Sequence, residues 1–136
     1  MNCVITVNLI GGFHMKESCK DYLNHSELRS FNETLFSFID EKGVKDSEIY
    51  KKVDIDRKLF SKIRCNNNYI PRRNVIIKLC LALGLKRNDF NKLLNSAGYS
   101  LSNSKFDLVI SYCLDNNIYD LKIVNDYLYT YSNTVL

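Results

Sequence analysis

The chain has 136 residues, of which 46% are hydrophobic and 25% are charged, a composition typical of one compact domain that needs no disulfide or metal to support its core. Five glycines and a single proline leave few turn signals for a sheet, so the fold class we expect is all-α. No apolar run approaches the roughly 18 residues that cross a bilayer, so we expect a soluble protein rather than a membrane protein.

Cysteine and histidine placement gives no indication of a metal site, a cofactor or catalysis. The five cysteines are far apart and form no C-x-x-C pair: Cys3, Cys19, Cys65, Cys80 and Cys113. His14 and His25 lie near no second ligand and away from any nucleophile elbow. The apolar stretch 4–10 has neither a basic n-region nor a cleavage signal, so it does not predict export. We therefore expect a cytoplasmic protein that is not an enzyme, with reduced thiols, no metal and no cofactor.

The formal net charge of +4 is concentrated in the middle of the chain. Residues 31–99 contain fourteen Lys/Arg against eight Asp/Glu, whereas residues 100–136 contain two against four. Between Arg57 and Arg87 there are nine Lys/Arg and no Asp or Glu. Such a bias is typical either of a protein that binds a polyanion or of a solvated basic face.

The first predicted elements are a short N-terminal helix and a longer core helix. Four residues at helical spacing predict the short one: Met15, Cys19, Tyr22 and Leu23. The core helix is predicted over residues 31–42, because Ser30 and Glu33 have the spacing of a capping box and Gly43 suits a left-handed C-terminal cap.

A second core helix is predicted over residues 47–52, followed by a tight turn and a third helix. Asp54 is expected in the turn, because Asp tolerates positive φ better than most residues, and Asp56 is expected to cap the third helix. The apolar residues of that helix should face the core: Leu59, Phe60 and Ile63. Its polar residues should face outward: Arg57, Lys58, Ser61, Lys62 and Arg64.

The remaining chain is predicted to be helical as well. Residues 65–70 form a loop, Pro71 suits the first helical turn, and a fourth helix spans 72–83 and ends at Gly84. The later helix boundaries are expected at Asn88, at Gly98, at Ser102 or Asn103, and at Asp120.

The predicted elements divide the chain into an N-terminal extension (1–29) with one short helix, a helical core (30–99) and a C-terminal helical addition (100–136). Five tyrosines cluster in the C-terminal addition: Tyr112, Tyr119, Tyr127, Tyr129 and Tyr131. Because the local charge is negative, we interpret them as packing residues or as a self-association face rather than as a platform for single-stranded bases.

The core resembles a known family of helix-turn-helix proteins. Residues 49–63, with the sequence IYKKVDIDRKLFSKI, look like the helix-turn-helix of the lambda-repressor-like (Xre) family. Pro71 and the run IKLCLALGL at 77–85 resemble the proline and the fourth helix of that family. The resemblance covers about residues 31–98.

A narrower resemblance reaches into the C-terminal addition. Residues 56–64, 97–99 and 105–107 are similar to a variant seen as a C-terminal tail on bacterial macro-domain and stress-associated proteins. The resemblance implies a five-helix core with extra C-terminal helices. It also implies binding to double-stranded DNA, as a transcriptional regulator or as the DNA-binding module of a stress or defence system. Since a helix-turn-helix monomer covers one half-site, a homodimer through the C-terminal helices is expected.

The resemblance assigns DNA contacts by position, because in this family the N-terminal half of the third helix presents side chains to base edges. The candidates for base contacts are Arg57, Lys58, Ser61 and Lys62, of which Arg57 or Lys58 would donate to guanine. The candidates for phosphate contacts are Lys62, Arg64, Arg72 and Arg73. Asn68, in the loop, suits either role.

Two residues depart from the family pattern. Tyr50 stands where the second helix usually has a small alanine, so its ring must tilt the helix pair or point elsewhere. Asp46 stands where a glutamine usually bonds a phosphate, which would repel a carboxylate. These departures support a second interpretation, in which the same scaffold is an adaptor that binds a protein with an acidic surface.

Overall fold

The computed structural model describes residues 18–25 and 29–136, which contain eight helices and no strand. The all-α fold class is thus confirmed for this part of the chain. The helices are α1 (Cys19–His25), α2 (Phe31–Lys42), α3 (Asp46–Lys52), α4 (Arg57–Cys65), α5 (Arg73–Leu83), α6 (Arg87–Ser96), α7 (Lys105–Asp115) and α8 (Leu121–Ser132). None of them is long and apolar enough to cross a membrane. Met15, His14 and the apolar stretch 4–10 lie outside the described residues.

The structure confirms the start and end of α2 and the turn before α4, which local sequence signals predicted. The side chains of Ser30 and Glu33 form the predicted capping box, and Gly43 ends α2 with a φ of 66°. Asp54 has a φ of 54°, in the left-handed region that Asp tolerates. These features depend on neighbouring residues alone, so the sequence suffices to predict them.

Several predicted helix boundaries are wrong by one or two residues. Asn88 lies inside α6, because Lys86 is the N-cap residue. Ser104, rather than Ser102 or Asn103, caps α7. Asp56 occupies the N-cap position of α4, but its side chain accepts no capping hydrogen bond. Pro71 precedes Arg72, the N-cap residue of α5, and so lies outside the first turn.

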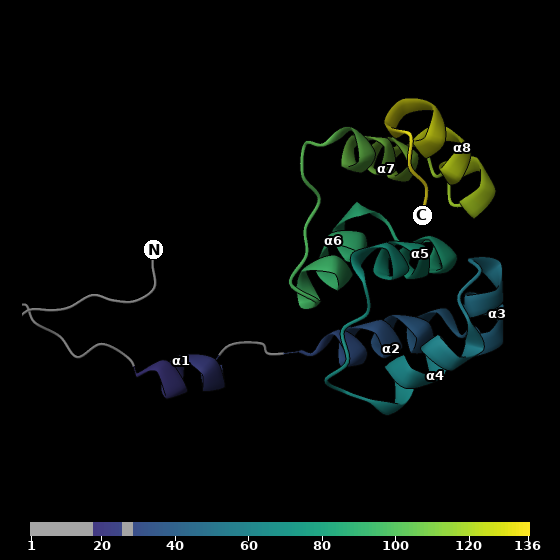
Figure 1. The fold of residues 1–136 in the computed structure, drawn as a ribbon. Coiled ribbons are helices and arrows are strands. Elements are labelled where there is room, and N and C mark those ends of the chain that lie inside the picture. The colour runs from purple at the N-terminus through teal and green to yellow at the C-terminus, as the bar shows by residue number, and fades with distance from the viewer. Residues whose placement is uncertain (1–17, 26–28) are drawn as a thin grey trace, which may run out of the picture.

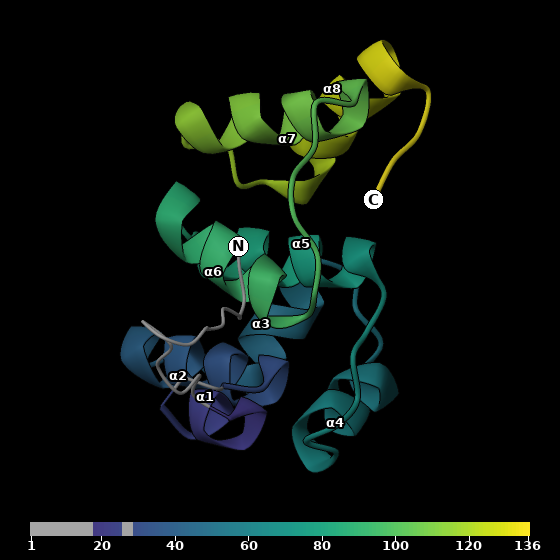
Figure 2. The ribbon, with the colours of Figure 1, turned by 90° about the vertical axis from the view of Figure 1, so that its left-hand side faces the viewer.

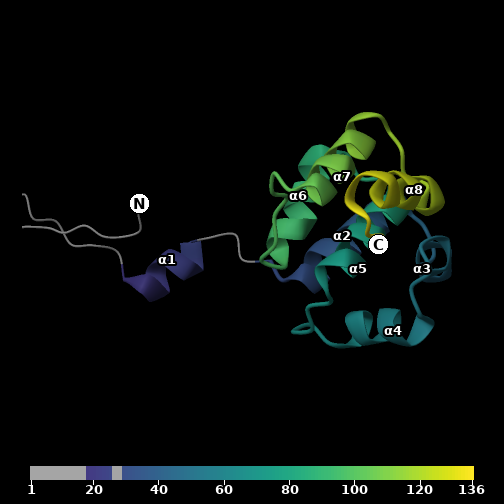
Figure 3. The ribbon, with the colours of Figure 1, turned by 45° about the horizontal axis from the view of Figure 1, so that its top comes forward.

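The helices form three tiers, with α5 in the middle (Figure 1). It contacts α2, α3 and α6, and every residue from 75 to 83 is buried or half-buried. In all three ribbon views α5 lies between α4 and α7 (Figures 1, 2 and 3). The α4 helix and the hairpin of α7 and α8 therefore occupy opposite ends of the molecule.

The α7–α8 hairpin is fastened to the middle tier by apolar and polar contacts. Ile110, Val124 and Leu128 are fully buried. Beside them, the buried carboxylate of Asp107 accepts hydrogen bonds from Arg73 Nη2 at 2.6 Å and from the backbone N–H of Ser102 at 2.6 Å. Burial alone would raise the pKa of Asp107, but these donors outweigh it and the pKa is lowered.

At the other end of α7 the hairpin is fastened by surface contacts. Arg87 binds both carboxylate oxygens of Asp115, at 2.8 and 2.9 Å from Nη2. The hydroxyl of Tyr119 donates to the backbone carbonyl of Leu85 at 3.0 Å. Tyr119 is thereby a packing residue, which leaves the other four tyrosines of the cluster for the surface of the hairpin.

We expect Asp107→Asn to lower the free energy of unfolding by about 2 kcal/mol at neutral pH, because it leaves a partly buried guanidinium without its counter-ion. Since the pKa of Asp107 is lowered in the folded state, its contribution is present above pH ~4 and is lost as the pH falls through the folded pKa. Urea unfolding at several pH values should show the deficit of the variant shrinking in acid.

Asp115→Asn is the matched control for this experiment. Its side chain also pairs with an arginine but is 60% exposed, so water replaces the lost partner and we expect a change of about 0–1 kcal/mol. Equal destabilisation by the two substitutions would contradict the special role of the buried carboxylate.

Candidate nucleic-acid interface

The predicted helix-turn-helix corresponds to α3, the turn at residues 53–56 and α4. The turn closes through a hydrogen bond from the Ile55 N–H to the Tyr50 carbonyl at 2.9 Å, and Ile55 itself is buried. In α4, Phe60 and Ile63 are buried against the core. The opposite face carries four exposed polar residues, all of them predicted: Arg57, Lys58, Ser61 and Lys62.

The C-terminal end of α4 is attached to α2 by a buried side chain. Asn32, which is 8% exposed, donates from Nδ2 to the Ile63 carbonyl at 2.6 Å. The last carbonyls of a helix have no partner within the helix, so this bond satisfies a group that would otherwise be buried without a donor. Asn32 therefore sets the position of α4 relative to α2.

Arg64 forms a second attachment at the same end of α4. Its Nε and Nη2 donate to the two oxygens of Asp46 at 2.6 and 2.7 Å, a bidentate pair across α3 and α4. Its guanidinium carbon also lies 4.0 Å from the ring centroid of Phe36. The hydrogen bond to Asp46 raises the pKa of Arg64. Arg64, predicted to contact phosphate, is instead engaged within the protein.

The ring of Tyr50, on α3, packs against the buried side of α4. Its centroid is 5.6 Å from that of Phe60, and Phe60 in turn makes an edge contact with Phe36 at 6.1 Å. Tyr50 is half-buried. The three rings form an aromatic cluster under α4, which is how the chain accommodates a large residue at this position.

Three further predicted site residues lie near the end of α4 and in the segment that follows it. Lys62 places its Nζ 4.4 Å from the ring centroid of Tyr69. Asn68 is exposed, and its backbone N–H donates to the Asn66 side chain at 3.0 Å. Arg72 is exposed at the start of α5. These residues remain accessible for contacts with a partner.

Ion pairs divide the nine cations between Arg57 and Arg87 into two groups. Arg64, Arg73 and Arg87 each pair with a carboxylate that lies outside this stretch of sequence. Arg73, predicted to contact phosphate, binds Asp107 and the Ser100 carbonyl instead. Within residues 18–25 and 29–136, no carboxylate lies within ion-pair distance of the other six cations.

Comparison with protein-family models, with curated proteins and with solved structures finds no match for this chain. In the described part of the chain, no three metal-ligating side chains gather in one place.

Sequence reasoning identified the exposed cations of α4 but missed the residues that hold the helix. Asn32 is one of three polar residues in the first turn of α2, and nothing in its sequence context shows that it reaches α4. Phe36 and Tyr69 read as ordinary apolar residues, although each stacks on a cation of α4. Only the three-dimensional arrangement shows these contacts.

We expect Asn32→Ala to destabilise the fold by about 2 kcal/mol, because the Ile63 carbonyl loses its buried donor. Asn68→Ala removes an amide of the same type from an exposed loop and should change stability by less than about 0.5 kcal/mol. Thermal unfolding of both variants measures the difference. Similar melting temperatures for the two would show that the bond to α4 contributes little.

Proposed function

We propose that this chain binds double-stranded DNA through the outward face of α4, as a protein of the lambda-repressor-like type. The observation that carries the proposal is a set of exposed cations on one face of a helix that follows a tight turn. None of them forms an ion pair with a described carboxylate: Arg57, Lys58 and Lys62. Cations on one exposed helix face are the electrostatic footprint expected of a groove-binding helix.

The arrangement of α4 supports separate roles for these residues. Arg57 and Lys58 are in the first turn of the helix, where side chains reach base edges, and either would donate to guanine. Lys62, together with Arg72, is assigned to phosphates, Ser61 to bases, and Asn68 to either. In this proposal Arg64 acts indirectly, by fixing α4 against α3 through Asp46.

The pairing of Asp46 with Arg64 also bears on the departure from the family pattern. A lone carboxylate at this position would repel phosphates, but here a bidentate guanidinium neutralises it. The chain therefore loses one favourable contact rather than acquiring a repulsive one. Residues 30–99 would form the DNA-binding core of a transcriptional regulator or of a stress or defence system.

Salt dependence gives the first test of this proposal. A mobility-shift titration with duplex DNA should show affinity that falls as a power of the salt concentration. Arg57→Ala combined with Lys62→Ala should abolish binding at moderate salt. At low salt the double variant should reduce the slope of log affinity against log salt concentration by about 2, since each cation that contacts the DNA contributes about 1.

The matched control for the pair is Lys92→Ala combined with Lys105→Ala, which removes the same charge from exposed positions on α6 and α7. Because neither helix carries a proposed DNA contact, this control should retain binding within about threefold. Equal losses for the two double variants would mean that net charge, rather than α4, drives association.

A second function is supported by the carboxylates around the start of α4. Asp54 and Asp56 are both exposed there, next to the cations that would face the duplex. A DNA backbone offers only negative charge, whereas a protein surface offers both signs. The mixed charge around Arg57 therefore favours the alternative, an adaptor that binds a protein with an acidic patch.

Asp46→Gln distinguishes the two functions, with Glu41→Gln as a control that removes one charge from an exposed position on α2. If the chain binds DNA, Asp46→Gln removes a negative charge beside α4 while the amide oxygen of Gln can still accept from Arg64, and it should raise duplex affinity several-fold beyond the control. If the chain is an adaptor, the unsubstituted protein should cause no mobility shift of duplex DNA at low salt. Tight binding of random duplex by the original protein, with no retention of a protein partner, would rule out the adaptor.

A further inference from the structure

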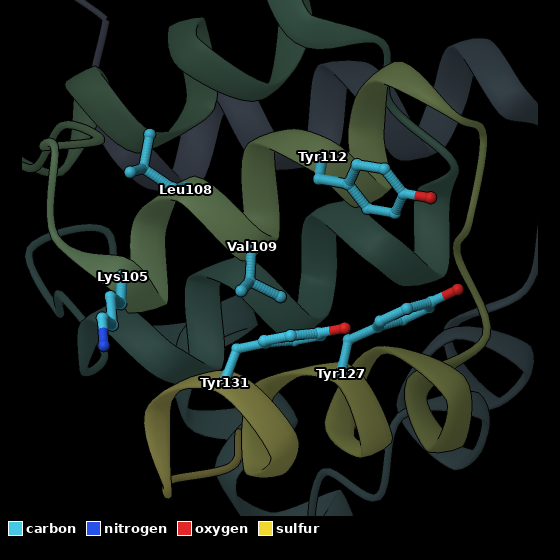
Figure 4. Close-up of a pocket in the computed structure, with 6 residues that line it drawn as sticks. All are labelled: Lys105, Leu108, Val109, Tyr112, Tyr127 and Tyr131. Atoms are coloured by element: carbon cyan, nitrogen blue, oxygen red, sulfur yellow. The ribbon is translucent and has the colours of Figure 1, made fainter.

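An apolar groove runs between α7 and α8 on the surface of the hairpin. It encloses about 490 Å³ and is lined by Leu108, Val109 and Tyr112 from α7 and by Tyr127 and Tyr131 from α8. Figure 4 shows the two tyrosines of α8 lying along the space between the helices, below Val109 and Tyr112, with Lys105 at one end. The groove is bordered by a single charged residue.

The groove residues are unusually exposed for apolar side chains. Leu108 is 52% exposed, Tyr112 50% and Tyr131 60%. Ile123, one turn before Tyr127 and just outside the lining of the groove, is 47% exposed. Four such side chains leave on the order of 400 Å² of surface uncovered, about half of the ~800 Å² that each partner contributes to a stable interface. A polar rim supplies the remainder in known interfaces.

Charge indicates which occupant fits this surface. Two of the four carboxylates of the hairpin region, Asp107 and Asp115, are paired with arginines of the middle tier. The charges that remain on the hairpin are two lysines and two aspartates, so its surface is neutral: Lys105, Lys122, Asp120 and Asp126. Two copies can meet here without repulsion, whereas the basic faces of two α4 helices would repel each other.

The position of the groove determines what such a dimer does. Figure 4 looks into the groove with the rest of the ribbon behind α7 and α8. Figures 1 and 2 place α4 at the far end of the molecule, beyond α5. Two copies that meet groove to groove therefore hold their α4 helices at the two outer ends of the dimer.

We infer that a second copy of this chain docks in the groove and that the resulting dimer joins two separate segments of duplex DNA. The bridging rests on the proposed function of α4, whereas the dimer does not. A dimer of this shape differs from one that binds the two half-sites of a palindrome, because such half-sites lie about 34 Å apart on one duplex and need both α4 helices on the same side.

Sedimentation without DNA tests the dimer. The protein should have twice its chain mass of 15.8 kDa at micromolar concentration. Tyr131→Glu, which places a charge in the groove, should weaken dimerisation at least about thirtyfold. Tyr129→Glu is the matched control, because Tyr129 is 66% exposed on the same helix but does not line the groove, and it should leave the dimer intact.

A two-duplex capture experiment tests the bridging. The protein is bound to duplex DNA on beads, and retention of a second, fluorescent duplex is measured. The original protein and Tyr129→Glu should retain it, and Tyr131→Glu should bind the beads but lose most of the retained fluorescence.

The possible failures are distinguishable. A monomer in sedimentation would overturn the docking of a second copy and would leave the groove to a different protein. A dimer that binds bead-bound duplex without retaining a second duplex would overturn the bridging. A dimer that binds no duplex at all would overturn the proposed function and the bridging together, while the sedimentation result would still establish the groove as the self-association surface.

Discussion

The burial of α5 in the middle of the molecule is the constraint on which the rest of the structure depends. Six of its eleven residues are buried: Ile76, Ile77, Leu79, Cys80, Leu81 and Leu83. A helix with so wide an apolar surface must be covered from several directions, so α2, α3 and α6 pack against it, and α7 lies against α6. The same burial raises the pKa of the Cys80 thiol, which keeps it protonated and apolar. The basic face of α4 and the apolar groove are consequently forced to opposite ends of the molecule.

Ion pairing between distant parts of the chain determines which cations are available to a partner. Arg73 and Arg87 belong to the acid-free stretch in sequence, yet in space each lies against a carboxylate of α7. These two pairs also neutralise the hairpin. One set of contacts therefore has two effects: it confines the free positive charge of this stretch to the remaining cations, α4 and Arg72 among them, and it leaves the surface around the groove without net charge. Counting charges along the sequence gives the correct sign of the net charge of the central region. It overestimates the number of cations that no carboxylate pairs with.

The features that the sequence predicted well are those set by a few adjacent residues. The capping box at Ser30, the left-handed turn at Asp54 and the glycine that ends α5 all follow from local backbone chemistry. The boundaries of α6 and α7 were misplaced, because Asn, Ser and Asp are interchangeable as caps and several stand close together there. Asn32 and the partners of Arg64 could not be predicted, since each contact joins residues 18 or more positions apart. The exposed face of α4 followed from periodicity, whereas what holds that face in place did not.

The separation of the two surfaces affects how selective the proposed DNA contacts can be. In a dimer with both α4 helices on one side, the second helix reads the same duplex and sequence discrimination adds across two half-sites. With the helices at opposite ends, each duplex is read by one α4, and its base readers are limited to Arg57, Lys58 and Ser61, with Lys62 shared between bases and phosphates. A good bidentate contact discriminates between bases by about 1–3 kcal/mol. Four base-contacting side chains at most therefore give modest sequence selectivity for one duplex. Binding then depends mainly on phosphate contacts, and the dimer favours places where two duplex segments are already close, because the second contact gains from a high effective concentration. The two proposals together describe a protein that responds to the arrangement of DNA more than to one short sequence.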